Sequence, residues 1–170
     1  FRALADACGA PLVVDLSHIA GLVAGGAHAS PFPYADIVTM TTHKTLRGPR
    51  GAMIFARRDA RGLPERIDRA VFPGLQGGPH EHTIAAIAVA LGEAADPKFR
   101  TYAARVVENA QALSGALKRL GWRIVSGGTD THLFLVDTWE QGVSGRLAAE
   151  VLEAEGIIVN KNMIPFDPRT

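Results

Sequence analysis

Three polar residues near the ends of apolar runs could carry out chemistry. Asp15 directly follows the apolar run 12–14, and His18 comes three residues later. Lys44 lies in the polar segment 41–51, after the β-rich run 36–41. The carboxyl ends of strands in α/β sheets are where ligands bind. A lysine at a strand end can form a Schiff base with a carbonyl group.

An acid held near that lysine could bind the protonated nitrogen of a pyridine ring. A lysine and an aspartate with these two tasks are what a pyridoxal phosphate (PLP) enzyme needs, since a protonated ring withdraws electrons from a carbanion at the substrate Cα. The alternative is that Asp15 caps a turn and Lys44 is solvated. The spacing by itself favours this alternative.

The elements that must position these residues alternate between strands and helices. Hydrophobic periodicity and turn residues predict an α/β fold. Loops are expected at 19–33 and 74–79, and a boundary near residue 95 separates domains 1–95 and 96–170. The expected helices are 1–8, 79–94, 97–120 and 144–154, and the expected strands are 12–15, 36–41, 52–56, 122–125, 132–137 and 157–159. The predicted apolar face of the third helix contains Phe99, Tyr102, Val106, Leu113, Leu117 and Leu120.

Composition narrows the class of protein. Hydrophobic residues make up 47% and charged residues 21%, the balance of a globular chain rather than of a disordered tail. The net charge of +1 gives no support to nucleic-acid binding driven by phosphate charge. The single cysteine, Cys8, excludes an internal disulfide and is expected to be buried. The spacings of four histidines do not fit a metal site, so no metal is predicted; they are His28, His80, His82 and His132.

No secretory signal or apolar run of membrane-spanning length is present, which predicts a cytoplasmic protein without a membrane partner. The chain begins with Phe1 inside a predicted helix and stops in a proline-rich loop. We therefore expect it to be an internal stretch of a longer protein.

Five segments resemble one enzyme family. They are 14–22 (VDLSHIAGL), 41–51 (TTHKTLRGPRG), 71–79 (VFPGLQGGP), 126–137 (SGGTDTHLFLVD) and 159–162 (VNKN). In this order, over nearly the whole chain, they closely resemble serine hydroxymethyltransferase. The resemblance implies part of the large PLP domain of aminotransferase-like enzymes (fold type I), followed by the start of a smaller α/β C-terminal domain.

The resemblance also implies roles for individual residues. Lys44 corresponds to the lysine that forms the internal aldimine with PLP, and Asp15 to the partner of the pyridine nitrogen. His18 corresponds to a histidine beside the phenolic oxygen of the cofactor. Thr41 corresponds to a threonine that assists exchange at the reacting amine, and His43 to a position linked to substrate specificity.

The resemblance implies supporting roles for four further residues. The backbone N–H groups of Gly77 and Gly78 would reach the cofactor phosphate of a neighbouring subunit, because glycine allows close approach and a helix N-terminus favours an anion. Arg50 would support the wall of the active site, and Asn162 would contact the pterin ring of folate. Arg47 stands where alanine is common and is expected to lie outside the chemistry.

The implied reaction is the reversible transfer of the serine hydroxymethyl carbon to tetrahydrofolate, giving glycine and 5,10-methylenetetrahydrofolate. A homodimer or higher oligomer would share the cofactor site between subunits. Other groups of the site, including the arginine for the substrate carboxylate, would lie outside these 170 residues. Two alternatives stay open: another aminotransferase-like PLP enzyme of the threonine aldolase type, or a piece that is not catalytic by itself.

Overall fold

Strands and helices alternate along the chain, which confirms the predicted mixed α/β class. The computed structural model describes residues 1–58 and 62–167. Its chain forms two units, Phe1–Ala104 and Arg105–Thr170, and the division falls inside helix α5 (Pro97–Arg119). A boundary between enzyme domains near residue 95 stays a prediction.

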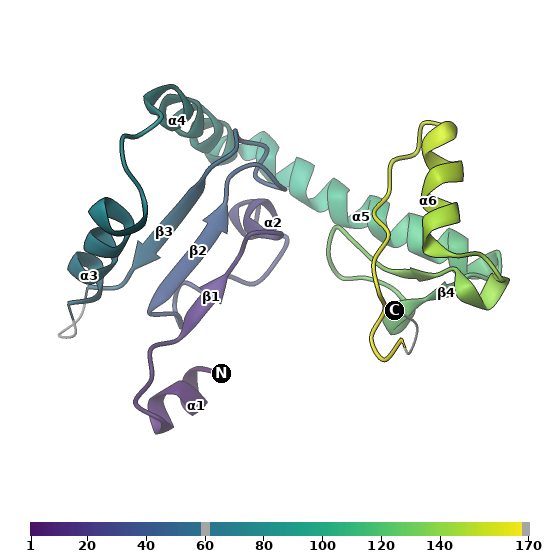
Figure 1. Ribbon diagram of the computed structural model, residues 1–170, viewed down its shortest axis with the longest axis horizontal. Helices are drawn as coiled ribbons and strands as arrows, with labels where there is room; N and C mark the ends of the chain where they lie inside the picture. Colours follow the sequence, from purple (N-terminus) through teal and green to yellow (C-terminus); the bar gives the residue numbers. More distant parts are fainter. Residues whose placement is uncertain (59–61, 168–170) are drawn as a thin grey trace. The chain divides into compact units, whose positions relative to one another are not determined.

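The first unit is built on a three-stranded sheet with β2 (Ile37–Thr41) in the middle, between β1 (Val13–Asp15) and β3 (Ala52–Ala56) (Figure 1). β1 and β2 are parallel, with Asp15 opposite Thr39, and β3 is antiparallel to β2. The carboxyl ends of parallel strands meet at one edge of a sheet. Asp15 and the segment that follows β2 therefore lie at the same edge.

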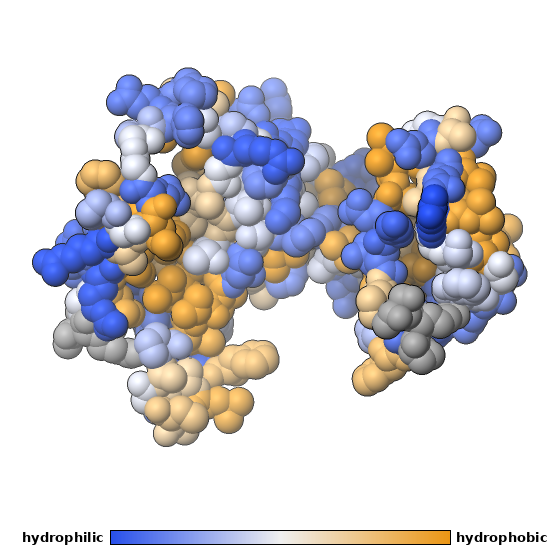
Figure 2. Space-filling model, viewed as in Figure 1, coloured by the Kyte–Doolittle hydropathy of each residue, from blue (hydrophilic) through white to orange (hydrophobic). Residues whose placement is uncertain are grey.

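The core of this unit lies between the sheet and the helices. Its buried apolar side chains come from β2, from the loops next to the strands, from the helix that begins at Ala20 and from α5: Leu16, Ala20, Ala35, Val38, Met40, Leu46 and Phe99. Strand β1 is not buried although its residues are mostly apolar: Val13 is 57% exposed. Within the described residues β1 pairs with β2 alone. Figure 2 shows the hydrophobic surface that remains near α1 (Arg2–Ala7), where Phe1 and Leu4 are exposed.

The segment 19–33, predicted as a loop, contains the short helix α2 (Ala20–Ala24). Its glycines reflect close packing. A Cβ on Gly21 would lie 2.1 Å from the Thr45 carbonyl oxygen, and one on Gly25 would lie 2.3 Å from the Ala103 Cβ. The glycines of this segment favoured the prediction of a loop. In the structure they instead allow a short helix to pack closely against neighbouring atoms.

The remaining helices of the unit include one that the sequence did not predict, α3 (Leu63–Arg69). It leads into the irregular segment η1 (Ala70–Leu75) and then to α4 (Glu81–Ala95), which confirms the predicted helix 79–94. Asp96 caps the start of α5, since its Oδ1 accepts a hydrogen bond from the Lys98 N–H at 2.8 Å.

The predicted apolar face of α5 is only partly correct. Phe99 is buried, but Leu113 and Leu120 are 55% and 76% exposed. The buried positions are instead mostly small: Phe99, Ala103, Ala110 and Ser114. Small side chains let neighbouring segments approach the helix closely, which a pattern of large apolar residues does not reveal.

The second unit contains the end of α5, the paired strands β4 (Arg123–Ile124) and β5 (Val136–Asp137), the 3₁₀ turns η2 (Val125–Gly127) and η3 (Trp139–Gln141), and α6 (Gly145–Ala154). The predicted helix 144–154 is confirmed, and the Ser144 hydroxyl caps it by accepting from the Leu147 N–H at 3.1 Å. The predicted strand 157–159 is wrong. It pairs with no strand of the described chain, and Ile158 is 83% exposed.

The prediction that Cys8 is buried is also wrong. It follows the last residue of α1 and is exposed rather than buried. The helix ends there because Gly9 adopts a φ of 64°, the left-handed conformation that favours glycine at a helix end.

Candidate active site

Asp15 ends strand β1 with its carboxylate exposed at the edge of the sheet. Its Oδ1 atom accepts three hydrogen bonds: from the Ser17 N–H at 3.0 Å, the Ser17 hydroxyl at 2.6 Å and the Thr39 hydroxyl at 3.1 Å. None of the hydrogen bonds within residues 1–58 and 62–167 uses Oδ2. One carboxylate oxygen is therefore held by the protein, and the other can accept a proton donor from a ligand.

These hydrogen bonds determine the charge of Asp15. The Ser17 hydroxyl is the main cause that lowers the pKa of the carboxyl below its ordinary value. Burial, the second-largest cause, raises the pKa, and the Ser17 N–H, the Thr39 hydroxyl and the charge of Lys44 each lower it by less. Asp15 is thus an anion at neutral pH, and Lys44 is near enough for its charge to act on it.

Lys44 lies in a tight turn after β2. The Arg47 N–H donates to the Lys44 carbonyl at 2.9 Å and closes the turn. Thr45 and Leu46, at its centre, are buried, whereas Lys44 is half-buried. The buried Thr42 anchors the segment before the turn, since its hydroxyl donates to the Pro49 carbonyl at 2.6 Å.

Threonine hydroxyls connect this segment to the loop after β1. Thr41 Oγ1 donates to the Ser17 carbonyl at 3.1 Å, and Thr45 Oγ1 donates to the His18 carbonyl at 2.8 Å. Thr45 Oγ1 also accepts from the Gly21 N–H at 3.0 Å. The Asp15–His18 loop and the Lys44 turn are thus joined side by side.

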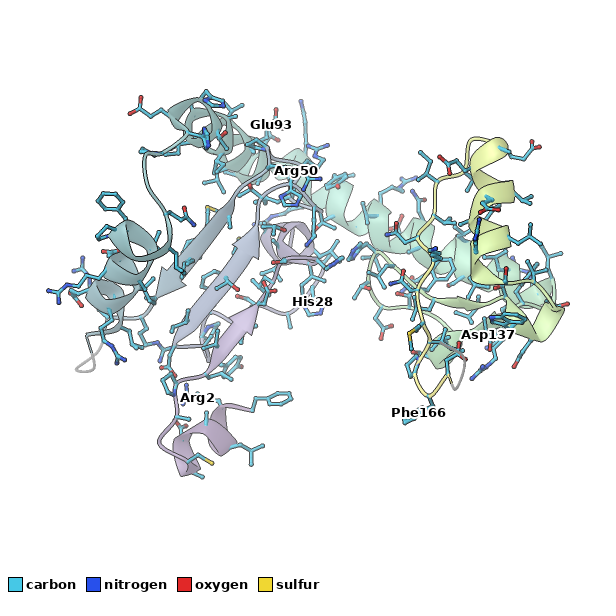
Figure 3. The ribbon with its side chains drawn as sticks, viewed as in Figure 1. Arg2, His28, Arg50, Glu93, Asp137 and Phe166 are labelled. Atoms are coloured by element: carbon cyan, nitrogen blue, oxygen red, sulfur yellow. The ribbon has the colours of Figure 1, made fainter. Side chains whose placement is uncertain are left out.

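His43 and Arg50 lie on the same segment as Lys44, and Figure 3 shows Arg50 at the edge where β2 ends. Arg50 Nη1 is 3.5 Å from His43 Nε2. An arginine is always a donor, so this contact requires a lone pair on Nε2 and places the proton of a neutral His43 on Nδ1. Nδ1 is buried and has no hydrogen-bond partner among the described residues. His18 is exposed at the same edge.

Similarity to known proteins shows the family to which the chain belongs. The family model described as serine hydroxymethyltransferase matches residues 1–170. The chain belongs to the serine hydroxymethyltransferase family.

Relatives named serine hydroxymethyltransferase agree with this assignment. The chain is 60% identical over 168 residues to the protein of Sphingopyxis alaskensis, 57% over 169 residues to that of Sorangium cellulosum and 56% over 169 residues to that of Desulfotalea psychrophila. Each alignment covers 99% of this chain and 38% or 39% of the relative. The chain thus spans about two fifths of the length of these serine hydroxymethyltransferases.

Three predicted site residues belong to other segments of the chain. Gly77 and Gly78 are exposed in the segment before α4, and a Cβ on either would have no neighbour within 4 Å in the described chain. Asn162 belongs to the second unit, where it lines an open groove beside α6 together with Arg146, Glu150 and Lys161. The roles of all three remain predictions.

Ser17 and Thr39 are site residues that the sequence analysis missed. A signal for Ser17 was available, since a carboxylate two residues before a serine is typical of a turn in which the aspartate accepts from the backbone. No comparable signal existed for Thr39, because its contact with Asp15 depends on strand register.

Across residues 1–58 and 62–167, no three His, Cys, Asp or Glu side chains are grouped so that they could hold a metal ion. Within the same residues, no helix combines the length and the hydrophobicity needed to cross a membrane.

Proposed function

We propose that this chain carries the lysine-bearing part of the active site of a glycine/serine hydroxymethyltransferase of fold type I. The reaction would be the PLP-dependent reversible transfer of the serine hydroxymethyl carbon to tetrahydrofolate, giving glycine and 5,10-methylenetetrahydrofolate. The supporting observation is the pairing of an ionised Asp15, with Oδ2 unoccupied by hydrogen bonds of the described chain, with Lys44 at the same edge of the sheet.

These residues fit PLP. When bound, the cofactor supplies an electron-withdrawing ring that stabilises negative charge at the substrate Cα. Asp15 is suited to hold the proton of the ring nitrogen, since an ionised acceptor forms a strong charge-assisted hydrogen bond with an N–H⁺ donor. The Lys44 amine would hold the cofactor covalently and release it when the amino group of serine or glycine replaces it.

The neighbouring side chains support this assignment in different ways. The Thr41 hydroxyl is engaged with the Ser17 carbonyl, so Thr41 would act at the amine by fixing the loop beside Lys44. His18 would face the phenolic oxygen of the cofactor from that loop. His43, held by Arg50, would shape the substrate side of the site and contribute to specificity.

The remaining roles depend on the whole protein. Gly77 and Gly78 would donate backbone N–H groups to the cofactor phosphate of a partner subunit in a homodimer or higher oligomer, and their exposure supports this role. Asn162 would contact the pterin ring of folate. We place the enzyme in the cytoplasm, without a nucleic-acid or membrane partner.

Reductive trapping of the cofactor tests the proposal. Borohydride treatment of the full-length enzyme should fix the pyridoxyl group on Lys44 and abolish the visible absorbance of the bound cofactor. Peptide mapping locates the label. A label on Lys98, Lys118 or Lys161 would refute the assignment, as would failure to retain PLP at all.

A threonine aldolase type of PLP enzyme would share the aspartate and the lysine. The match of the family model over the complete chain favours the hydroxymethyltransferase instead. Assay of the full-length enzyme with serine, in the presence and absence of tetrahydrofolate, separates the two. Serine cleavage that does not depend on tetrahydrofolate would support the aldolase.

A further inference from the structure

The turn that carries Lys44 is attached to helix α5 by a side chain that the proposed chemistry does not use. The Arg47 guanidinium lies over the Tyr102 ring, 4.3 Å from its centroid, and 5.3 Å from the centroid of Phe99. The two rings are themselves in contact, with centroids 5.1 Å apart. A guanidinium over an aromatic face is attracted by the negative face of the ring.

A second contact joins the same turn to the same ring. The Tyr102 hydroxyl donates to the Thr45 carbonyl at 3.3 Å, one residue after Lys44. Tyr102 therefore binds the turn at two points: its ring faces Arg47 and its hydroxyl contacts Thr45. The carboxylate of Glu93 is 3.9 Å from Arg47, but both side chains are about half exposed, so this ion pair contributes little.

The backbone of Arg47 is adapted to this contact. Its φ of 62° lies in the left-handed region, which is uncommon for residues other than glycine. In this conformation the Arg47 N–H closes the turn on the Lys44 carbonyl. A conformation that costs energy is maintained only where surrounding contacts compensate for it, and the contacts with Tyr102 and Phe99 are such contacts.

We propose that Arg47 is a positioning residue for Lys44: by stacking on Tyr102 it fixes the Lys44–Arg47 turn to α5 and thereby increases the rate at which the Lys44 amine captures the cofactor. The reason is geometric, since a reacting amine must return to one point in space, and small displacements of a reacting group are costly. This inference rests on the proposed function, because it takes Lys44 as the lysine that binds PLP.

The test uses the full-length enzyme with its cofactor removed. Excess PLP is added, samples are quenched with borohydride over time, and the label on Lys44 is quantified by mass spectrometry. Arg47→Gly removes the guanidinium and suits the positive φ, so backbone strain does not confound the result. We expect this variant to be labelled about threefold to tenfold more slowly, the range of a partly desolvated cation–π contact.

Three further variants make the result specific. Arg47→Lys keeps a cation above the ring and should recover part of the rate. Tyr102→Phe keeps the ring and should show a smaller loss. Arg100→Ala removes an exposed arginine from the same helix and should be labelled at the parental rate. Because Arg47→Lys and Tyr102→Phe are conservative changes, they keep the test possible if Arg47→Gly folds poorly.

The outcomes separate the possible roles. If Arg47 only stabilised the fold, Arg47→Gly would lower the melting temperature while the labelling rate well below that temperature matched Arg100→Ala, and the positioning role would be wrong. In a double-mutant cycle with Tyr102→Leu, effects on the rate that simply multiply would also overturn it. A label on another lysine would instead refute the proposed function, whatever the effect of Arg47.

Discussion

The packing of α2 against the Lys44 turn predicts a large effect from adding one methyl group. Gly21 lies on α2, and its N–H donates to the Thr45 hydroxyl at 3.0 Å. In Gly21→Ala, the new Cβ would lie 2.1 Å from the Thr45 carbonyl oxygen, 2.3 Å from the Thr45 carbonyl carbon and 2.8 Å from the Leu46 nitrogen. All three atoms belong to the backbone, so no side-chain rotation relieves the contact.

The size of the effect follows from these distances. Ordinary contact begins at 3.4 Å, so helix and turn must separate by about 1.3 Å (3.4 minus 2.1). Overpacking of this kind costs about 1–3 kcal/mol, and loss of the hydrogen bond to Thr45 costs about 1 kcal/mol. Alanine recovers about 1 kcal/mol by its higher helix propensity. We expect a net destabilisation of about 1–3 kcal/mol.

The separation should also disturb the site, because the displaced backbone is that of Thr45, the neighbour of Lys44. The assay is urea unfolding of the full-length enzyme, together with PLP retention during dialysis. Gly92→Ala is the matched control: it also adds a methyl group to a helix glycine, but nothing in the described chain lies within 4 Å of the new Cβ. It should be neutral or stabilising by up to about 1 kcal/mol. A Gly21→Ala enzyme with the stability and PLP retention of Gly92→Ala would refute the packing argument.

Three further predictions concern the candidate site. Asp15→Asn should keep the far-ultraviolet circular dichroism spectrum of the enzyme but lower its turnover by at least about tenfold, since a neutral amide does not hold the ring proton as an ionised carboxylate does; parental turnover would make Asp15 a structural turn residue. Ser17→Ala should raise the pKa of Asp15 toward its ordinary value of 3.8. The stabilisation from Asp15 is present above its unfolded pKa and is lost as pH falls through the folded pKa, so the variant should lose it at a higher pH; an unchanged carbon-13 titration of Asp15 would contradict this. Gly78→Val should weaken PLP retention and shift sedimentation toward smaller oligomers together, and a fully dimeric variant with parental PLP affinity would leave these glycines as a simple turn.

The sequence supported a correct fold class because its strongest signals are local. The β-rich runs that became β2 and β3 have bounds within one residue of those predicted. Helix α2 was missed because Gly21 and Gly25 look like loop residues until the atoms that exclude a Cβ are known. The strand predicted at 157–159 failed for the opposite reason: β-branched residues favour a strand, but a strand also needs a partner.

The candidate site likewise combines residues that local sequence signals indicate with residues that only long-range contacts bring to it. Residue type and position make Asp15 and Lys44 candidates, but the spacing by itself favours a turn-capping aspartate and a solvated lysine. Only the resemblance of the surrounding segments predicts their roles. Their supports cannot be found in this way. Thr39 reaches Asp15 across 24 residues of sequence, Thr45 reaches His18 across 27, and Tyr102 reaches Thr45 across 57.

Apart from the contact of Thr39 with the Asp15 carboxylate, the long-range contacts of the site share a chemical feature that explains why sequence patterns do not reveal them. Thr41, Thr45 and Tyr102 each donate a hydroxyl to a backbone carbonyl, an acceptor that every residue possesses. The type of the residue that supplies the carbonyl therefore gives no indication of the contact. Each such bond nevertheless fixes backbone at or beside the segments that carry Lys44 and His18, so the position that we propose for the reacting lysine depends on hydroxyls bonded to the backbone. Replacing one of them should change how fast Lys44 reacts more than which reaction the enzyme performs.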